Sequence, residues 1–229
     1  MTNGTPVDGD VARTNAAYWN ELARLHATGN ATYDVEHVRS GSSSLRDLEV
    51  TELGPVAGQR LLHLQCHTGL DTISLARLGA TVVGVDSSPV AIEVATNLAR
   101  ESSCDAAFVC CAVEALPEEF SQAFDVVFMS YGVLIWLADL RALMLAIRKA
   151  LRPGGVLYLV DEHPFAAVFS PVRTGLAFQP YAPYDSGGRP YRSVNDVSYA
   201  DPSVSLVNRT QYKWAHSMSA LINAVVDAF

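Results

Sequence analysis

Apolar and polar residues follow two different periods along the middle of the chain. Between residues 60 and 162, short apolar runs of strand type alternate with segments in which apolar positions recur every three or four residues. The strand-like runs are RLLHLQ (60–65), TVVGVD (81–86), AAFVCCA (106–112), FDVVFMS (124–130) and VLYLVDE (156–162). The helix-period segments run from about Asp71 to Leu78, from Pro89 to Arg100, and through Leu140, Leu143, Ile147 and Leu151. This alternation predicts an α/β fold, a doubly wound and mostly parallel sheet with helices on both faces.

Capping residues support these boundaries. Ser88 followed by Pro89 is typical of a helix cap and first turn, and Gly79 ends the helix before it. The RPGG segment at 152–155 predicts a turn between the last of these helices and the strand that follows.

Two helices are expected before the sheet. After a start that we expect to be disordered, RTNAAYWNELARLHATG (13–29) places apolar side chains, Tyr18 among them, at helical spacing. Ser43 is a cap candidate before Leu45, and Gly54 closes the second helix.

Residues 163–210 do not continue the alternation of strand-like and helix-period segments. They hold six of the eleven prolines and four of the nine tyrosines, with little apolar periodicity. Such a stretch is typically a functional lid or a disordered linker, and its aromatic content favours the lid. A strand-like RTQYKWAH (209–216) and a helix, SMSALINAVVDAF (217–229), follow.

Composition narrows the range of partners. Sixteen basic against twenty-four acidic side chains give a net charge of −8, which repels nucleic-acid phosphates and anionic membranes and favours a small-molecule substrate. The four cysteines show neither the spacing of a zinc site nor that of a secreted disulfide framework, so we expect reduced thiols. The polar start predicts no signal peptide, and no apolar run approaches the roughly eighteen residues of a membrane span. We therefore expect a soluble, cytoplasmic protein.

The turn after the first strand is the first candidate site. In an open parallel sheet, ligands bind beyond the carboxyl ends of the strands where the strand order reverses, so QCHTG (65–69) is expected to face a cofactor. Gly69 lacks a Cβ and lets the backbone approach a ligand where the next helix begins. Asp86 ends the second strand 21 residues after Gln65, where a carboxylate accepts hydrogen bonds from ribose hydroxyls. The alternative is that Asp86 only caps the helix beginning near Ser88.

A nicotinamide dehydrogenase is the competing interpretation of this turn. Its pyrophosphate needs a GxGxxG turn, whereas Gly69 is followed by Leu70 and Asp71. The Asp71 carboxylate opposes a pyrophosphate and tolerates an ammonium. A cofactor with a zwitterionic amino-acid end therefore fits better.

The chain resembles the class I S-adenosylmethionine-dependent methyltransferases. The likeness rests on LLHLQCHTGLDTISLARLGATVVGVDSSPVAIEVA (61–95), FVCCAVEALP (108–117), FDVVFMSYGVLIWLADL (124–140) and LRPGGVLYLVDEHP (151–164). It is particularly similar to a bacterial subgroup with LHLQCHxGLDT in place of the usual LDxGCGTG. The resemblance is strong over 61–164 and weak over 214–229. It implies a Rossmann-like fold, S-adenosylmethionine as cofactor, S-adenosylhomocysteine as product, and methyl transfer to a small-molecule O or N acceptor.

Carried over by position, the resemblance implies how the cofactor is held. The residues lining it are Gln65, Cys66, His67 and Gly69 at the methionine end, Asp71 and the Ser130 backbone near the amino group, Asp86 and Ser87 at the ribose, and Ala112, Val113 and Glu114 at the adenine edge. The acid usual at the first adenine position is replaced by Ala112, at a cost of about 1 kcal/mol for one hydrogen bond. Glu114 is the substitute acid, and the Val113 N–H remains in reach of the ring.

Methyl transfer mainly needs an aligned acceptor in a water-poor pocket, because the sulfonium is already activated. A general base matters when the acceptor must lose a proton. The candidates are Tyr131, Glu162, His163 and His216. For His163, acid–base work, a hydrogen bond to substrate and capping of the next turn stay open. Tyr131 and Trp136 are also expected as pocket walls, and His216 also as a cap of the last helix.

Several other residues have a functional and a structural interpretation. Tyr18 and Trp19 lie where related enzymes close an N-terminal helix over the cofactor, and we expect Tyr18 to contact the cofactor and Trp19 to pack in the core. His63 is expected to be a satisfied core histidine. Asp161 and Glu162 have no metal-site spacing, so no metal is predicted.

Three expectations concern the whole chain. Family members follow the last helix with an antiparallel strand pair that has no counterpart here, so we expect truncation relative to the gene or strands supplied from elsewhere. The exposed sheet edge favours association between copies. With Ala112, this leaves a non-catalytic S-adenosylmethionine-binding or regulatory protein as the alternative function. We expect one domain with an N-terminal helical cap (1–54), a cofactor-binding core (61–162), a lid insertion (163–210), and a terminal strand and helix (211–229).

Overall fold

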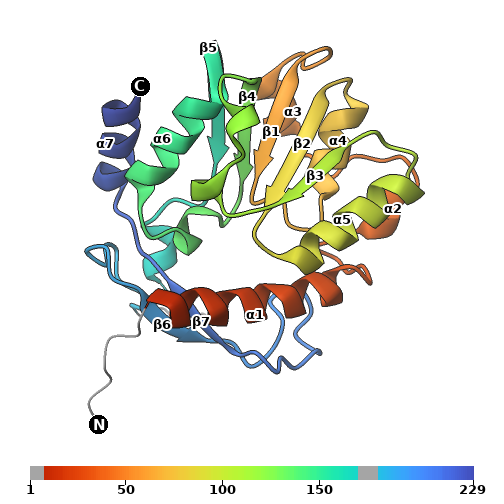
Figure 1. Ribbon diagram of the computed structural model, residues 1–229. Coiled ribbons are helices and arrows are strands. Elements are labelled where there is room, and N and C mark those ends of the chain that lie inside the picture. The colour runs from red at the N-terminus through yellow and green to blue at the C-terminus, as the bar shows by residue number, and fades with distance from the viewer. Residues whose placement is uncertain (1–7, 170–179) are drawn as a thin grey trace.

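A five-stranded parallel sheet forms the centre of the computed structural model, which describes residues 8–169 and 180–229 (Figure 1). Its strands are β1 (Arg60–Leu64), β2 (Thr81–Asp86), β3 (Ala107–Cys110), β4 (Phe124–Ser130) and β5 (Leu151–Val160), in the order β3-β2-β1-β4-β5. The order reverses between β1 and β4, which pair directly. The predicted α/β sheet is confirmed, and its ligand crevice is expected at the carboxyl ends of these two strands.

Helices pack on both faces of the sheet. They are α4 (Leu70–Arg77), α5 (Pro89–Glu101), α6 (Leu140–Ala150) and α7 (Met218–Ala228). Leu62 and Leu64 of β1 share a buried cluster with Met144 of α6. Leu61 shares another with Leu75 of α4. Successive β1 side chains therefore support opposite layers, as the alternation of a strand requires.

The boundaries agree with the sequence in most places. Ser88 caps α5 as predicted, because its Oγ accepts a hydrogen bond from the Ala91 N–H. The predicted RPGG turn at 152–155 needs correction, because β5 already begins at Leu151. These residues form an irregularity within the strand, where the pairing with β4 shifts.

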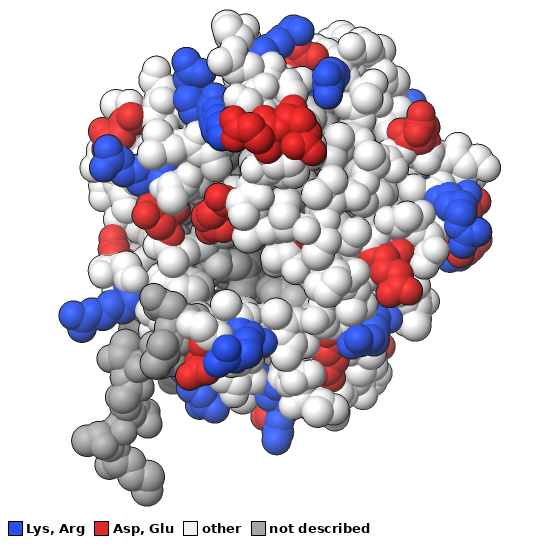
Figure 2. Space-filling view, in the orientation of Figure 1, with Lys and Arg blue, Asp and Glu red and all other residues white. Residues whose placement is uncertain are grey.

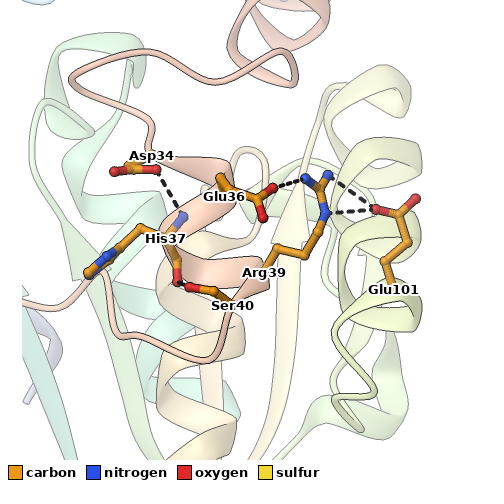
Figure 3. Close-up of polar contacts among 6 residues, drawn as sticks. All are labelled: Asp34, Glu36, His37, Arg39, Ser40 and Glu101. Carbon is orange, nitrogen blue, oxygen red and sulfur yellow. Dashed lines mark hydrogen bonds and ion pairs between the residues drawn. The ribbon is translucent and has the colours of Figure 1, made fainter.

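The N-terminal part holds three helices rather than two, α1 (Asp8–His26), α2 (Val35–Arg39) and α3 (Asp47–Leu53). The predicted start of α3 at Ser43 is wrong: Arg46 is its N-cap, although Gly54 ends it as expected. The unpredicted α2 is capped by Asp34, which accepts a hydrogen bond from the backbone of the helix, and Arg39 ties it to Glu101 of α5 (Figure 3).

The described part of 180–213 contains a two-stranded antiparallel sheet, β6 (Tyr191–Val194) and β7 (Thr210–Lys213). The strand-like segment RTQYKWAH (209–216) therefore contains β7, which pairs with β6 and not with the central sheet. Figure 1 shows this hairpin and α1 below the carboxyl ends of the central strands. We call α1 and the β6–β7 hairpin the cap layer. Residues 170–179 of the predicted lid lie outside the described residues.

The side chain of Asn15 joins the two parts of the cap layer. Its amide donates to the Tyr212 carbonyl and accepts from the Tyr212 N–H, both at 2.8 Å. The Glu21 carboxylate of α1 also accepts the backbone N–H groups of Val207 and Asn208. The cap layer is therefore one packed unit across the edge of the sheet where the crevice is expected.

Charges on the visible surface are mixed. Figure 2 shows Lys and Arg interspersed with Asp and Glu over this face, and a hollow near its centre. Among the described residues, no helix has both the length and the apolar character needed to cross a membrane. In 8–169 and 180–229, no group of His, Cys, Asp and Glu side chains could hold a metal ion.

Candidate active site

The turn between β1 and α4 has an unusual backbone. Gln65 and His67 have positive φ angles of 54° and 48°, in the left-handed region that side chains other than glycine rarely adopt. The Asp86 carboxylate holds this conformation, since it accepts the His67 N–H at 2.9 Å and the Ser88 N–H at 2.8 Å. Asp86 therefore joins the turns after β1 and β2 beside the point where the strand order reverses.

Asp86 has capacity for a further partner. Each of its oxygens accepts one of these two bonds, the Ser87 N–H acts on the carboxylate as a third donor, and the two oxygens together offer about four lone-pair sites. Burial raises the pKa of Asp86, and the backbone N–H donors act in the opposite direction. The bond from Ser88 shows that Asp86 orders the start of α5, and the remaining lone-pair capacity leaves the carboxylate able to bind a sugar.

Gln65, Asp71 and Ser130 come together at the ends of β1 and β4. The Gln65 amide donates to the Val133 carbonyl at 3.3 Å, while its Oε1 is buried without a hydrogen-bond partner among the described residues. Asp71 accepts from the hydroxyls of Ser44 and Ser130 at 2.6 and 3.1 Å. An unpaired acceptor beside a carboxylate is suited to a cationic hydrogen-bond donor.

Gly69 and Cys66 face the protein interior. A Cβ on Gly69 would lie 2.8 Å from the Ala95 Cβ and 2.8 Å from the Phe108 ring, so this glycine lets α5 and β3 approach the turn. The Cys66 thiol is buried, and burial raises its pKa. Both residues were predicted to line the cofactor. Because the Cys66 side chain is buried and Gly69 has none, only their backbone atoms are available at the turn.

His67 belongs to an aromatic cluster under the cap layer. Its Nε2 lies 2.8 Å from His26 Nδ1, and its ring also contacts the rings of Trp19 and Tyr33. Tyr199, from the segment after β6, completes the cluster with its hydroxyl bonded to that of Tyr33. The cluster connects α1 and the segment after β6 to the turn.

Tyr18 and Trp19 of α1 have different surroundings. Tyr18 is 1% exposed and stacks on Trp136, and its hydroxyl accepts the Asn195 amide at 3.3 Å. Trp19, expected as a packing residue, is the one that contacts His67 of the turn. The side of α1 that meets the turn is therefore the Trp19 side.

The predicted adenine edge follows β3. Val113 is buried in the short 3-10 helix η1 (Val113–Ala115), while Ala112 precedes it. Glu114 and Ser87 are both exposed. Glu114 is thus accessible to a ligand, although it has no partner that fixes its carboxylate among the described residues.

The acid–base candidates already have partners. His163 is exposed at the end of β5, and its Nδ1 accepts the Phe165 N–H at 3.2 Å. The Tyr131 hydroxyl donates to Glu49, and the Arg46 guanidinium lies 4.0 Å from the centre of its ring. The contact with Glu49 and burial raise the pKa of Tyr131.

Two other candidates have structural contacts. His216 Nε2 lies 2.8 Å from the Leu137 carbonyl, and Ser217 is the residue that caps α7. Asp161 accepts the backbone N–H groups of Val133 and Leu134 at 3.1 and 3.0 Å and also that of Gly132. Asp161 therefore orders the loop after β4 instead of facing a metal site.

His63 is a core histidine, as expected. Its Nδ1 lies 2.8 Å from Thr72 Oγ1 and its ring packs edge-on against Phe128. Burial lowers the pKa of His63 to about 4, so it is neutral at pH 7.

The sequence did not identify His26, Gln211 or Lys213 as residues near the site. No local pattern could identify His26, because its partner His67 is distant in the chain. Gln211 and Lys213 alternate along β7, which places them on one face of the strand. Their alternation within RTQYKWAH was the available signal.

Residues 61–155 match the family model of a methyltransferase domain. The matched segment covers less than half of the chain. It spans the sheet from β1 into the irregular start of β5, and so includes the turn at 65–69 and Asp86.

Curated relatives match parts of the chain. The chain is 39% identical over 105 residues to a ubiquinone biosynthesis O-methyltransferase of Brucella anthropi, covering 46% of this chain and 42% of the relative. It is 30% identical over 154 residues to the protein of the same name from Xanthomonas oryzae pv. oryzae, covering 66% of this chain and 64% of the relative. The chain thus spans less than half the length of the first relative.

A solved structure resembles almost the whole chain. The DhpI–SAH complex aligns with 97% of this chain and 89% of its own, with a TM-score of 0.61 and 18% identity. At this identity the likeness concerns the fold, and it extends beyond residues 61–155 to the cap layer and α7.

Proposed function

We propose that this protein is a class I S-adenosylmethionine-dependent methyltransferase that acts on the oxygen or nitrogen of a small molecule. The observation that carries the proposal is Asp86, which ends β2 and meets the turn at 65–69 at the reversal of strand order. The match of residues 61–155 to a methyltransferase domain supports it.

The residues at this junction fit the cofactor. The remaining lone-pair capacity of Asp86 suits the ribose hydroxyls, and the buried, unpaired Oε1 of Gln65 suits the ammonium of the methionine end. Asp71 adds a negative charge on the same side. The bound cofactor supplies a methyl group that its sulfonium has already activated.

The protein's own part in the reaction is alignment and exclusion of water. Asp161 orders the loop after β4, along which the acceptor lies, and Trp19 of the cap layer packs on Trp136 of that loop to cover the crevice. With Nδ1 accepting the Phe165 N–H, His163 has only Nε2 left to exchange a proton with an acceptor. Tyr131 serves as a wall, since its hydroxyl is held by Glu49.

The name of the relatives, ubiquinone biosynthesis O-methyltransferase, supports oxygen as the accepting atom. The mixed charges of Figure 2 and the net charge of −8 support a small-molecule acceptor over a nucleic acid. Ala112 favours the second candidate, a protein that binds the cofactor without turnover, because one adenine hydrogen bond is missing.

Calorimetry with S-adenosylhomocysteine tests the binding step, and transfer of a labelled methyl group to a panel of hydroxylated and aminated small molecules tests turnover. Binding together with transfer is the expected result. Binding without transfer to any acceptor would support the second candidate. The absence of binding, with the protein folded by circular dichroism, would refute both.

A further inference from the structure

The cap layer presents two polar side chains whose hydrogen-bonding capacity is not filled within the described residues. Gln211 of β7 is 0% exposed; its amide lies beside the Tyr18 hydroxyl, whose pKa it lowers, but neither its Oε1 nor its Nε2 makes a well-aligned hydrogen bond there. Lys213, two residues along the same strand, is half-buried over the Trp136 ring and makes no hydrogen bond or ion pair in the described part of the chain. Buried polar groups in folded proteins nearly always have well-formed hydrogen bonds, so Gln211 with an unpaired ammonium on the same face points to a ligand.

Both side chains lie on one face of β7. In the register of the hairpin, Gln211 pairs with Ser193 and Lys213 with Tyr191, and residues two apart along a strand share a face. That face meets Trp136, since Lys213 Nζ lies 5.4 Å from the centre of its ring. It also meets Tyr18, which stacks on the same indole.

The face lies next to the proposed cofactor end of residues 61–155. The Trp214 N–H donates to the Ile135 carbonyl at 2.8 Å, which fixes β7 against η3 (Leu134–Trp136). At the other end of this loop, Val133 accepts the Gln65 amide. One loop after β4 therefore has the cofactor residue Gln65 at one end and the Lys213 ammonium at the other.

The charge of Lys213 defines the chemistry of the ligand. Burial lowers the pKa of Lys213, while the charge of Glu162, which does not reach ion-pair distance, acts in the opposite direction. An anion placed between the ammonium and the Gln211 amide satisfies both groups at once. The indole of Trp136 and the ring of Tyr18 offer flat apolar walls beside it.

We propose that Gln211 and Lys213 form the specificity site for the methyl acceptor, and that the acceptor carries a carboxylate next to a flat, aromatic body. The carboxylate accepts hydrogen bonds from the Lys213 ammonium and the Gln211 amide, and the aromatic body lies along Trp136 toward Gln65. The assignment rests on the proposed methyltransferase function, because it places this ligand beside the cofactor.

The chain allows a direct test, since Lys149 and Lys213 are its only lysines. Reductive methylation with carbon-13 formaldehyde labels both lysines and the α-amino group, and NMR then reports on each amine, with the Lys213 signal assigned as the one missing from Lys213→Met. The probes are benzoate, 4-hydroxybenzoate and phenylacetate, each compared with its neutral amide, added to protein saturated with S-adenosylhomocysteine. We expect the acids to move the Lys213 signal and to leave the Lys149 signal in place.

Three variants separate the site from general charge effects. Lys213→Met should weaken binding of the preferred acid by about tenfold, equal to about 1.4 kcal/mol, while leaving its amide unchanged. Gln211→Glu keeps the side-chain shape but supplies Lys213 with a carboxylate, and should block the acids in the same way. Lys149→Met is the matched control, because Lys149 pairs with Glu118 on the surface, and it should change nothing.

Binding of S-adenosylhomocysteine is measured first and separately. If it is absent, the methyltransferase proposal fails and the acceptor site fails with it. If it is normal but every acid binds no better than its amide, or Lys213→Met binds the acids as tightly as the unaltered protein, the acceptor assignment alone is overturned. In that case, buried water satisfies Gln211, and Lys213 has no ligand.

Discussion

The rings of His26 and His67 meet edge to face, with 2.8 Å between His26 Nδ1 and His67 Nε2. One nitrogen must donate and the other accept, so the two rings cannot both be protonated while the contact lasts. Burial lowers the pKa of His26 to about 4 and that of His67 to about 3. This contact joins α1 of the cap layer to the turn that faces the proposed cofactor.

The first prediction is that acid destabilises the protein through these rings. In the unfolded chain both histidines take up protons below pH 6.5, whereas the folded state resists protonation until about pH 4. The free energy of unfolding should therefore fall between pH 6.5 and 4, by up to about 1.4 kcal/mol per pH unit for each histidine. Urea unfolding of His26→Gln should show a shallower fall, while His37→Gln, at an exposed position, should match the unaltered protein. Equal slopes for all three proteins would contradict this account.

The second prediction concerns Asp86. Asp86→Asn removes the charge that suits the ribose hydroxyls, and should weaken S-adenosylhomocysteine binding at least about tenfold by calorimetry. Asp125→Asn is the matched control: its carboxylate also accepts a backbone N–H, that of Arg60 at 2.7 Å, but at the opposite edge of the sheet. Both variants should lose some stability, and only Asp86→Asn should lose affinity. An unchanged affinity would place the ribose elsewhere.

The central sheet was predictable because its strands have a simple physical signature. Strands β2 and β4 were predicted to the residue, since parallel strands covered on both faces read as continuous apolar runs. The start of α3 was not, because the Ser43 hydroxyl accepts the Leu45 N–H without starting a helix, while Ser44 donates its hydroxyl to Asp71, 27 positions away. Capping preferences depend on neighbouring residues, so they cannot predict a contact between residues so far apart in the chain.

The candidate site was predictable only where it depends on strand ends. Asp86 and Ser130 end parallel strands, so the alternation of strands and helices in the sequence is enough to locate them. Trp19 contacts the turn and Tyr18 does not, because of the way in which α1 packs on the hairpin. That packing is set by contacts such as Asn15 with Tyr212, between residues almost 200 positions apart, which no local pattern records.

The third prediction distinguishes close packing from backbone strain. Gly69 and Gly58 have the same φ of 77°, but a Cβ on Gly58 meets nothing within 4 Å, whereas one on Gly69 meets Ala95 and Phe108 at 2.8 Å. Gly58→Ala should cost about 1 kcal/mol of unfolding free energy through strain alone. Gly69→Ala should cost about 2–4 kcal/mol, because a clash adds to the strain. Similar costs in chemical denaturation would show that α5 and β3 adjust without loss.

The fourth prediction tests whether the cap layer is one unit. Asn15→Leu leaves the N–H and the carbonyl of Tyr212 without their partner, at a cost of about 1–3 kcal/mol. The Tyr212 amide should exchange with deuterium faster, and so should amides of the neighbouring β7, while β1 and β4 of the central sheet keep their protection. Asn97→Leu, on the exposed side of α5, is the control and should leave all these rates unchanged. Because α1 also contacts the turn through Trp19 and His26, loosening it should weaken S-adenosylhomocysteine binding as well. Faster exchange confined to Tyr212, with binding unaltered, would mean that the hairpin and α1 act independently at the crevice.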